Sequence, residues 1–131
     1  MFNWALRQID FVMAYPQAPI EEDIYMEHPQ GIKTAPGNFM DHVLKPLKNI
    51  YGQKQAGCVW NLYRFEKLAS IGFQPSLKDD CVFYCDNIIF MVYVDDGIFV
   101  GNDDTQLQDI IKEVQGLGPV SYTHLTLPTK A

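Results

Sequence analysis

Two adjacent carboxylates, Asp95 and Asp96, lie between two apolar runs of the chain, residues 88–92 (IIFMV) and residues 98–100 (IFV). Short runs rich in β-branched and aromatic residues predict two buried strands, with both acids at the tip of the hairpin that joins them. Two like charges in such a place cost desolvation and repulsion unless a cation compensates for them. Ligation by oxygen atoms alone favours Mg²⁺ or Mn²⁺ as that cation.

A third carboxylate, Asp10, could complete such a site. Asp10 interrupts an apolar run near the start of the chain, shortly before the aromatic Tyr15. Together, Asp10, Asp95 and Asp96 could hold two metal ions about 3.5–4 Å apart, the arrangement used for phosphoryl and nucleotidyl transfer. The residues alone leave a plainer alternative open, in which Asp95 and Asp96 form a polar turn and Asp10 lies at the end of a strand.

The composition describes one globular domain. The chain has 131 residues, of which 47% are hydrophobic, and this is enough for a single core. Its net charge of −6 argues against a free-standing nucleic-acid binder, because affinity for phosphates comes mainly from Lys and Arg. An acidic metal site, or basic residues supplied by other segments, would remove that objection. The sequence has no apolar window long enough to span a membrane and no recognisable signal peptide, so an intracellular location is expected.

The three cysteines, Cys58, Cys81 and Cys85, do not have the spacing of a zinc site. They are interpreted as reduced, buried core residues.

Strands and helices alternate along the sequence, which predicts an α+β fold with an antiparallel sheet backed by helices. A strand over residues 6–15 carries Asp10, and Pro16 and Pro19 then interrupt regular structure. One helix is expected to end at Gly72, and another to begin at Thr105, which has capping-box spacing to Gln108. Further short strands are expected over residues 24–26, 43–44 and 81–85.

Four short blocks of the sequence carry a resemblance to a known family. They are residues 8–15 (QIDFVMAY), 22–31 (EDIYMEHPQG), 51–60 (YGQKQAGCVW) and 93–96 (YVDD). In the same order they are similar to the motifs Q-L-D-V-K-x-A-F, E-x-x-Y-M-x-Q-P-x-G-F, L-Y-G-L-K-Q-A-P-R-x-W and Y-V-D-D. The chain therefore resembles the reverse transcriptase domain of copia-type retrotransposons over about residues 6–118. In combination, the four blocks outweigh the plain-turn alternative.

The resemblance implies RNA-directed DNA polymerase activity and an incomplete polymerase palm, with part of the fingers, within residues 1–118. It implies that Asp10, Asp95 and Asp96 are catalytic and bind two Mg²⁺ (or Mn²⁺) ions. One ion would lower the pKa of the primer 3′-hydroxyl, and the other would neutralise the triphosphate and its leaving pyrophosphate.

The resemblance also gives four residues a role in substrate binding. Tyr15 stands where the family has an aromatic steric gate that excludes the ribose 2′-hydroxyl, although its ring could instead simply pack under Pro16. Gln55 would contact the incoming nucleotide with Lys54 nearby, and Tyr93 would pack beside the primer end. The implied partners are the RNA or DNA template-primer, deoxynucleoside triphosphates and the remaining Gag-Pol domains, integrase and ribonuclease H. The implied location is a cytoplasmic virus-like particle.

The sequence departs from the family motifs at three places. Gln53 replaces an apolar residue, Gly57-Cys58 replaces Pro-Arg, and Val12-Met13 stands where Lys and a small polar residue are usual. The upstream fingers segment, the thumb and ribonuclease H are not recognised, so the fragment alone is expected to be inactive, because these parts position the substrates.

Two other functions were weighed against the polymerase. One is a decayed or domesticated fragment that acts as a non-catalytic binding module. The other is a small metal-dependent phosphatase, which is discounted because it needs a second acid two positions after Asp10, where Val12 stands.

The last residues, 119–131, form a separate segment in this interpretation. The sequence from Ser121 onward is similar to translated adapter or vector sequence. We therefore expect residues 119–131 to be non-native or disordered, and His124 to have no role as a metal ligand.

Overall fold

The computed structural model describes residues 4–31 and 42–125 of the chain. Its elements, in chain order, are β1 (Ala5–Phe11), α1 (Ala14–Gln17), α2 (Ala56–Ser70), β2 (Gln74–Pro75), β3 (Val82–Cys85), β4 (Ile88–Tyr93), β5 (Asp96–Gly101), α3 (Asp104–Leu117) and β6 (Val120–Leu125). The strands form one six-stranded sheet in the order β2-β3-β4-β5-β1-β6, and every neighbouring pair is antiparallel. The predicted α+β fold with an antiparallel sheet is confirmed.

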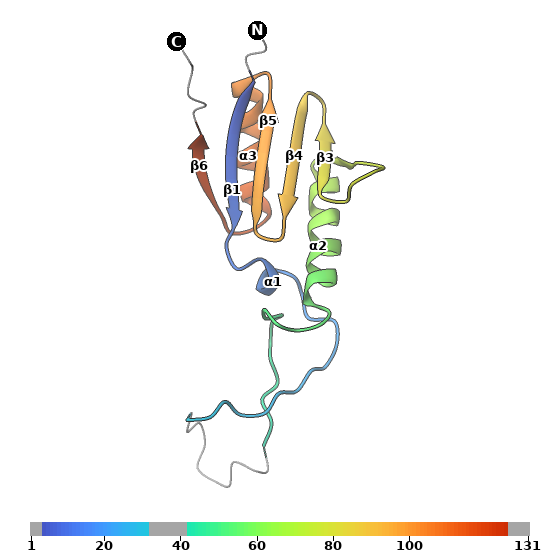
Figure 1. Ribbon diagram of the computed structural model, residues 1–131, viewed down its shortest axis with the longest axis vertical. Coiled ribbons are helices and arrows are strands. Elements are labelled where there is room, and N and C mark those ends of the chain that lie inside the picture. The colour runs from blue at the N-terminus through green and yellow to red at the C-terminus, as the bar shows by residue number, and fades with distance from the viewer. Residues whose placement is uncertain (1–3, 32–41, 126–131) are drawn as a thin grey trace.

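The core lies between the sheet and the helices α2 and α3. Along β4 the buried residues alternate as Ile88, Phe90 and Val92, and these pack in one cluster with Leu68 of α2 and Leu107 of α3. Both helices therefore cover the same face of the sheet, and Figure 1 shows α3 behind β1 and β5. The opposite face of the strands carries no described helix.

The order of the longer elements places β1 in the interior of the sheet. Apart from the short α1, β2 and β3, the chain runs β1-α2-β4-β5-α3-β6, the split β-α-β arrangement that appears twice in β-α-β-β-α-β folds. The hairpin of β4 and β5 pairs with β1 on one side, and β6 pairs with β1 on the other. The segments that carry Asp10 and Asp96 are consequently neighbours, although they are far apart in sequence.

The strand expected over residues 6–15 is shorter than predicted. β1 ends at Phe11, and Met13 adopts a left-handed conformation (φ 53°, ψ 58°) that turns the chain into the short helix α1, which contains Tyr15 and Pro16. Proline is tolerated there because the amides of a first helical turn have no intrahelical acceptor. The strands expected over 24–26 and 43–44 are reduced to a single bridge between Met26 and Leu44.

Residues 120–125 belong to the segment that was expected to be non-native or disordered. These residues form β6, which pairs with the whole of β1 from Phe11 opposite Val120 to Leu6 opposite Leu125. An edge strand is held largely by backbone hydrogen bonds, and Val120 also packs against the core. Residues 126–131 lie outside the described residues, and the non-native origin of the segment stays a prediction.

Two smaller expectations are also corrected. α3 is capped by Asp103, whose side chain accepts hydrogen bonds from the amides of Thr105 and Gln106, so Thr105 is not its cap. All three cysteines are free thiols, but Cys58 is exposed and the other two are only partly buried. In the part of the chain that the structure describes, no helix combines the length and the apolarity needed to cross a bilayer.

Gly97 is the tightest point of the sheet beside the carboxylates. A Cβ atom at this position would lie 2.5 Å from Cε2 of Phe90 and 3.0 Å from Cγ1 of Ile9. We expect Gly97→Ala to lower the free energy of unfolding by about 1–3 kcal/mol, because neither buried neighbour can withdraw without disturbing the core.

Gly116→Ala is the matched control for that substitution. Gly116 lies in α3 with no atom near its potential Cβ, so alanine should be neutral or stabilise by up to about 1 kcal/mol. Urea denaturation of both variants measures the difference. Equal stability of the two variants would contradict the close packing described for Gly97.

Candidate active site

Asp10 and Asp96 face each other across two antiparallel strands. Asp10 is the Cα partner of Asp96 in the register of β1 and β5. On β1 the buried residues Ile9 and Phe11 flank the exposed Asp10, and on β5 the buried Gly97 follows the exposed Asp96. Both carboxylates therefore point to the face that α2 and α3 leave open. Directly opposed residues have Cβ atoms about 4.5–5.5 Å apart, a spacing at which like charges repel and one cation can bind both.

Asp95 lies in the two-residue turn that joins β4 to β5, and two hydrogen bonds fix this turn. Val94 adopts a left-handed φ of 50°, which is strained for a β-branched residue. The indole Nε1 of Trp60 donates a hydrogen bond to the carbonyl of Val94 (2.9 Å), and the amide of Phe11 donates one to the carbonyl of Asp95 (2.7 Å). α2 and β1 thus hold the backbone of the turn in a conformation that it would not adopt alone.

The side chain of Asp95 is engaged by Tyr51. The Tyr51 hydroxyl lies 3.0 Å from each carboxylate oxygen of Asp95 and donates to this group. The ring of Tyr51 stacks on that of Tyr15, with centroids 4.5 Å apart and planes 28° apart. Partial burial of the hydroxyl and its hydrogen bond to Asp95 raise the pKa of Tyr51. The sequence had indicated Tyr51 only as part of a motif, because the pairing depends on how the loop folds back.

Asn49 holds that loop in position. Its side chain is buried, and its amide donates to the carbonyls of Ala18 (3.1 Å) and Pro19 (2.9 Å), just after α1. The segment that leads to Tyr51 is therefore attached to the segment that carries Tyr15. The sequence gives no sign of these two hydrogen bonds, because they join residues about 30 positions apart.

Two of the three predicted metal ligands, Asp10 and Asp96, lie opposite each other in the sheet. In residues 4–31 and 42–125, no group of three or more His, Cys, Asp or Glu side chains is placed to hold a metal ion together. Asp10 and Asp96 are opposed and free to share an ion, whereas the carboxylate of Asp95 is bound to Tyr51. The donor chemistry of the opposed pair fits a divalent cation, and Asp95 lies in the turn directly before Asp96.

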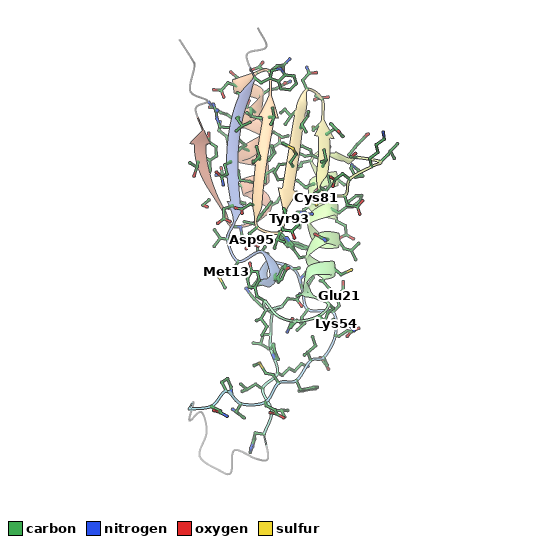
Figure 2. The ribbon with its side chains drawn as sticks, in the orientation of Figure 1. Met13, Glu21, Lys54, Cys81, Tyr93 and Asp95 are labelled. Carbon is green, nitrogen blue, oxygen red and sulfur yellow. The ribbon has the colours of Figure 1, made fainter. Side chains whose placement is uncertain are left out.

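The residues expected to bind substrate surround this end of the sheet. Tyr93 is 76% exposed and is the Cα partner of Asp96, on the side away from Asp10. Figure 2 shows Tyr93 and Asp95 at the end of the sheet nearest α1, and Lys54 near the start of α2. Lys54 is exposed, and Gln55 is half-buried at the N-cap of α2, without a side-chain capping hydrogen bond. Their roles in nucleotide binding remain predictions.

Comparison with known proteins gives one family. The model of the family described as "Reverse transcriptase (RNA-dependent DNA polymerase)" matches residues 1–122. The chain is 36% identical over 115 residues to the retrovirus-related Pol polyprotein from transposon RE1 of Arabidopsis thaliana, a match that covers 83% of the chain and 8% of that protein. It is 35% identical over 103 residues to the protein of the same description from transposon TNT 1-94 of Nicotiana tabacum, covering 75% of the chain and 8% of that protein.

A more distant relative comes from yeast. The chain is 25% identical over 114 residues to the transposon Ty1-GR3 Gag-Pol polyprotein of Saccharomyces cerevisiae, covering 86% of the chain and 6% of that protein. The chain thus spans less than a tenth of the length of the curated relatives it matches. No solved structure matches it.

The contact between Tyr51 and Asp95 can be tested by titration of the tyrosines. Because the pKa of Tyr51 is raised in the folded state, its proton stabilises the fold below the unfolded pKa of about 10, and this contribution is lost as the pH rises through the folded value. We expect Tyr51→Phe to remove a late step from the tyrosinate absorbance curve of the folded chain. Tyr84→Phe, on the exposed surface of β3, should keep that step. A late step that survives in Tyr51→Phe would contradict the contact.

Proposed function

Because the chain belongs to the reverse transcriptase (RNA-dependent DNA polymerase) family, we propose that it forms part of the palm of an RNA-directed DNA polymerase. The resemblance to copia-type elements that the four sequence blocks predicted is confirmed. The observation that carries the proposal is the opposition of Asp10 and Asp96 on the open face of the sheet, next to Asp95.

The proposed catalytic role belongs to three carboxylates. Asp10 and Asp96 would hold a divalent cation, Mg²⁺ or Mn²⁺, and Asp95, directly before Asp96, would join them. When bound, such ions activate the primer 3′-hydroxyl and neutralise the triphosphate in nucleotidyl transfer. Strands β1 and β5 keep the backbones of the opposed pair at a fixed separation, so the carboxylates need little rearrangement to bind an ion.

Four residues are proposed to bind the substrate. Tyr15 would act as the steric gate that selects deoxynucleotides, and its stacking on Tyr51 restricts where its ring can lie. Gln55 and Lys54 would contact the nucleotide, and Tyr93, which is mostly exposed, would pack beside the primer end.

Partners and location are part of the proposal. The matched relatives are Pol and Gag-Pol polyproteins, so we propose that this chain works beside integrase and ribonuclease H portions of one polyprotein. Its substrates would be a template-primer and deoxynucleoside triphosphates, and its place of action a virus-like particle.

One observation favours the alternative of a non-catalytic module. In the part of the chain that the structure describes, no three acidic side chains are placed to hold one metal ion. A domesticated fragment would need no metal, and a polymerase would. Metal binding therefore separates the two functions.

We expect the chain to bind Mn²⁺, and Asp10→Asn and Asp96→Asn each to weaken binding at least about tenfold, which is about 1.4 kcal/mol. The reason is that each substitution removes one of two charges that face the same ion. Asp109→Asn on the exposed surface of α3 is the matched control, since the ion pair of Asp109 within residues 4–31 and 42–125 is with Lys112 (3.3 Å). Electron paramagnetic resonance of free Mn²⁺ measures the affinities. Equal binding by the control and the two site variants would contradict the polymerase proposal and leave the non-catalytic module.

Catalysis by the 131 residues alone is a separate question. We expect no primer extension on an RNA template with Mg²⁺, because positioning of template, primer and triphosphate needs surfaces beyond this sheet. The measurement is incorporation of labelled deoxynucleotides, with a complete reverse transcriptase as positive control. Robust synthesis by this chain, abolished by Asp96→Asn, would refute the expected inactivity while supporting the catalytic assignment.

A further inference from the structure

The hydroxyl of Tyr51 takes a particular place on the carboxylate of Asp95. It lies 3.0 Å from Oδ1 and 3.0 Å from Oδ2, so it sits in front of the group, midway between the two oxygen atoms. A cation that binds both oxygens of one carboxylate occupies this same position. While the hydroxyl is there, each oxygen of Asp95 offers an ion only its outer side.

A closed turn presents Tyr51 to Asp95. The amide of Gln53 donates to the carbonyl of Ile50 (3.4 Å), and the amide of Ile50 donates to Oε1 of Gln53 (3.2 Å). Gly52, within this turn, has a φ of 96°, a conformation that residues with a side chain rarely adopt. Gln53 stands where the family motif has an apolar residue, which could not accept the second of these hydrogen bonds. This departure from the motif thus closes the turn that carries Tyr51.

The ring of Tyr51 is held in place as well as its backbone. It stacks on the ring of Tyr15, and the buried side chain of Asn49 attaches the preceding loop to the segment after α1. A water molecule in front of Asp95 could be displaced by an arriving ion at little cost. A hydroxyl fixed by these contacts cannot move away without breaking them.

Divalent cations differ in how they use a carboxylate. Ca²⁺ takes about six to eight oxygen ligands and can bind both oxygens of one carboxylate. Mg²⁺ needs a nearly ideal octahedron, and the narrow angle between the two oxygens of one carboxylate does not fit that geometry. A carboxylate that offers one oxygen therefore deprives Ca²⁺ of a ligand and takes nothing from Mg²⁺.

We propose that Tyr51 is a positioning residue that limits Asp95 to one oxygen ligand and so favours Mg²⁺ or Mn²⁺ over Ca²⁺. This inference rests on the proposed function, in which Asp95 joins Asp10 and Asp96 in binding a cation. Figure 2 shows Asp95 at the end of the sheet nearest α1, the helix that contains Tyr15. Tyr51 acts through Asp95 and does not itself touch the ion.

Competition with Mn²⁺ measures this selectivity. Mg²⁺ and Ca²⁺ are each used to displace Mn²⁺ from the complete chain, and electron paramagnetic resonance of the free Mn²⁺ gives a Kd for each ion. We expect Tyr51→Phe to lower the ratio of the Ca²⁺ Kd to the Mg²⁺ Kd at least about threefold, because Ca²⁺ gains the second oxygen of Asp95. The substitution keeps the ring that stacks on Tyr15. An unchanged or higher ratio would overturn the proposal.

Two controls separate this role from a merely structural one. Tyr84→Phe, on the exposed surface of β3, should keep the ratio of the unaltered chain. In an Asp95→Asn background, Tyr51→Phe should leave the ratio unchanged, because an amide offers a single oxygen with or without the hydroxyl. A fall in the ratio for Tyr84→Phe, or one for Tyr51→Phe that persists without the Asp95 carboxylate, would overturn the proposal.

Infrared spectroscopy gives a second test that needs no substitution of Tyr51. The separation between the symmetric and antisymmetric stretches of a carboxylate differs between ligation through one oxygen and ligation through two. The bands of Asp95 are those that Asp95→Asn removes. We expect them to show one-oxygen ligation with Mg²⁺ and with Ca²⁺ alike, and two-oxygen ligation of Ca²⁺ would overturn the proposal.

Failure of this inference is distinguishable from failure of the proposed function. If Asp10→Asn and Asp96→Asn weaken Mn²⁺ binding while Tyr51→Phe leaves the ratio unchanged, the cation site stands and the role of Tyr51 is wrong. If neither aspartate substitution weakens binding, the proposed function is wrong and this inference with it.

Discussion

The register of β1 against β5 is the constraint on which the site depends. It sets Asp10 directly opposite Asp96 and sends both to the face that the helices do not cover. A slip of one residue would turn one of these carboxylates into the core, where an unpaired charge is not tolerated. Gly97 enforces the register, because only a residue without a side chain fits between Phe90 and Ile9. Core packing on one face thus determines the chemistry on the other.

The turn between β4 and β5 has a strained backbone that contacts with other elements stabilise. Val94 adopts a left-handed conformation that its side chain disfavours, and the hydrogen bond from Trp60 stabilises it. The carboxylate of Asp95 is meanwhile bound to Tyr51, whose ring also packs on Tyr15. One tyrosine therefore links the proposed nucleotide gate to one of the proposed metal ligands.

The parts of this structure that follow local rules were predictable from the sequence. Two apolar runs rich in β-branched and aromatic residues predicted the hairpin beside Asp95 and Asp96, and the acid within an apolar run predicted the strand of Asp10. The helix at Tyr15 was missed, because a proline in a first helical turn looks the same as a proline that ends a strand. The contact of Tyr51 with Asp95 was missed because it depends on segments remote in sequence. β6 was missed because backbone pairing at a sheet edge needs little from the side chains.

Asp10 and Asp96 are proposed to form one cation site across β1 and β5. Diffraction from crystals of the chain grown with Mn²⁺, recorded at a wavelength where manganese scatters anomalously, tests it most directly. We expect an anomalous peak with carboxylate oxygens of both residues at about 2.1 Å from it. Manganese bound only elsewhere, or strands paired in a register that separates the two residues, would contradict it.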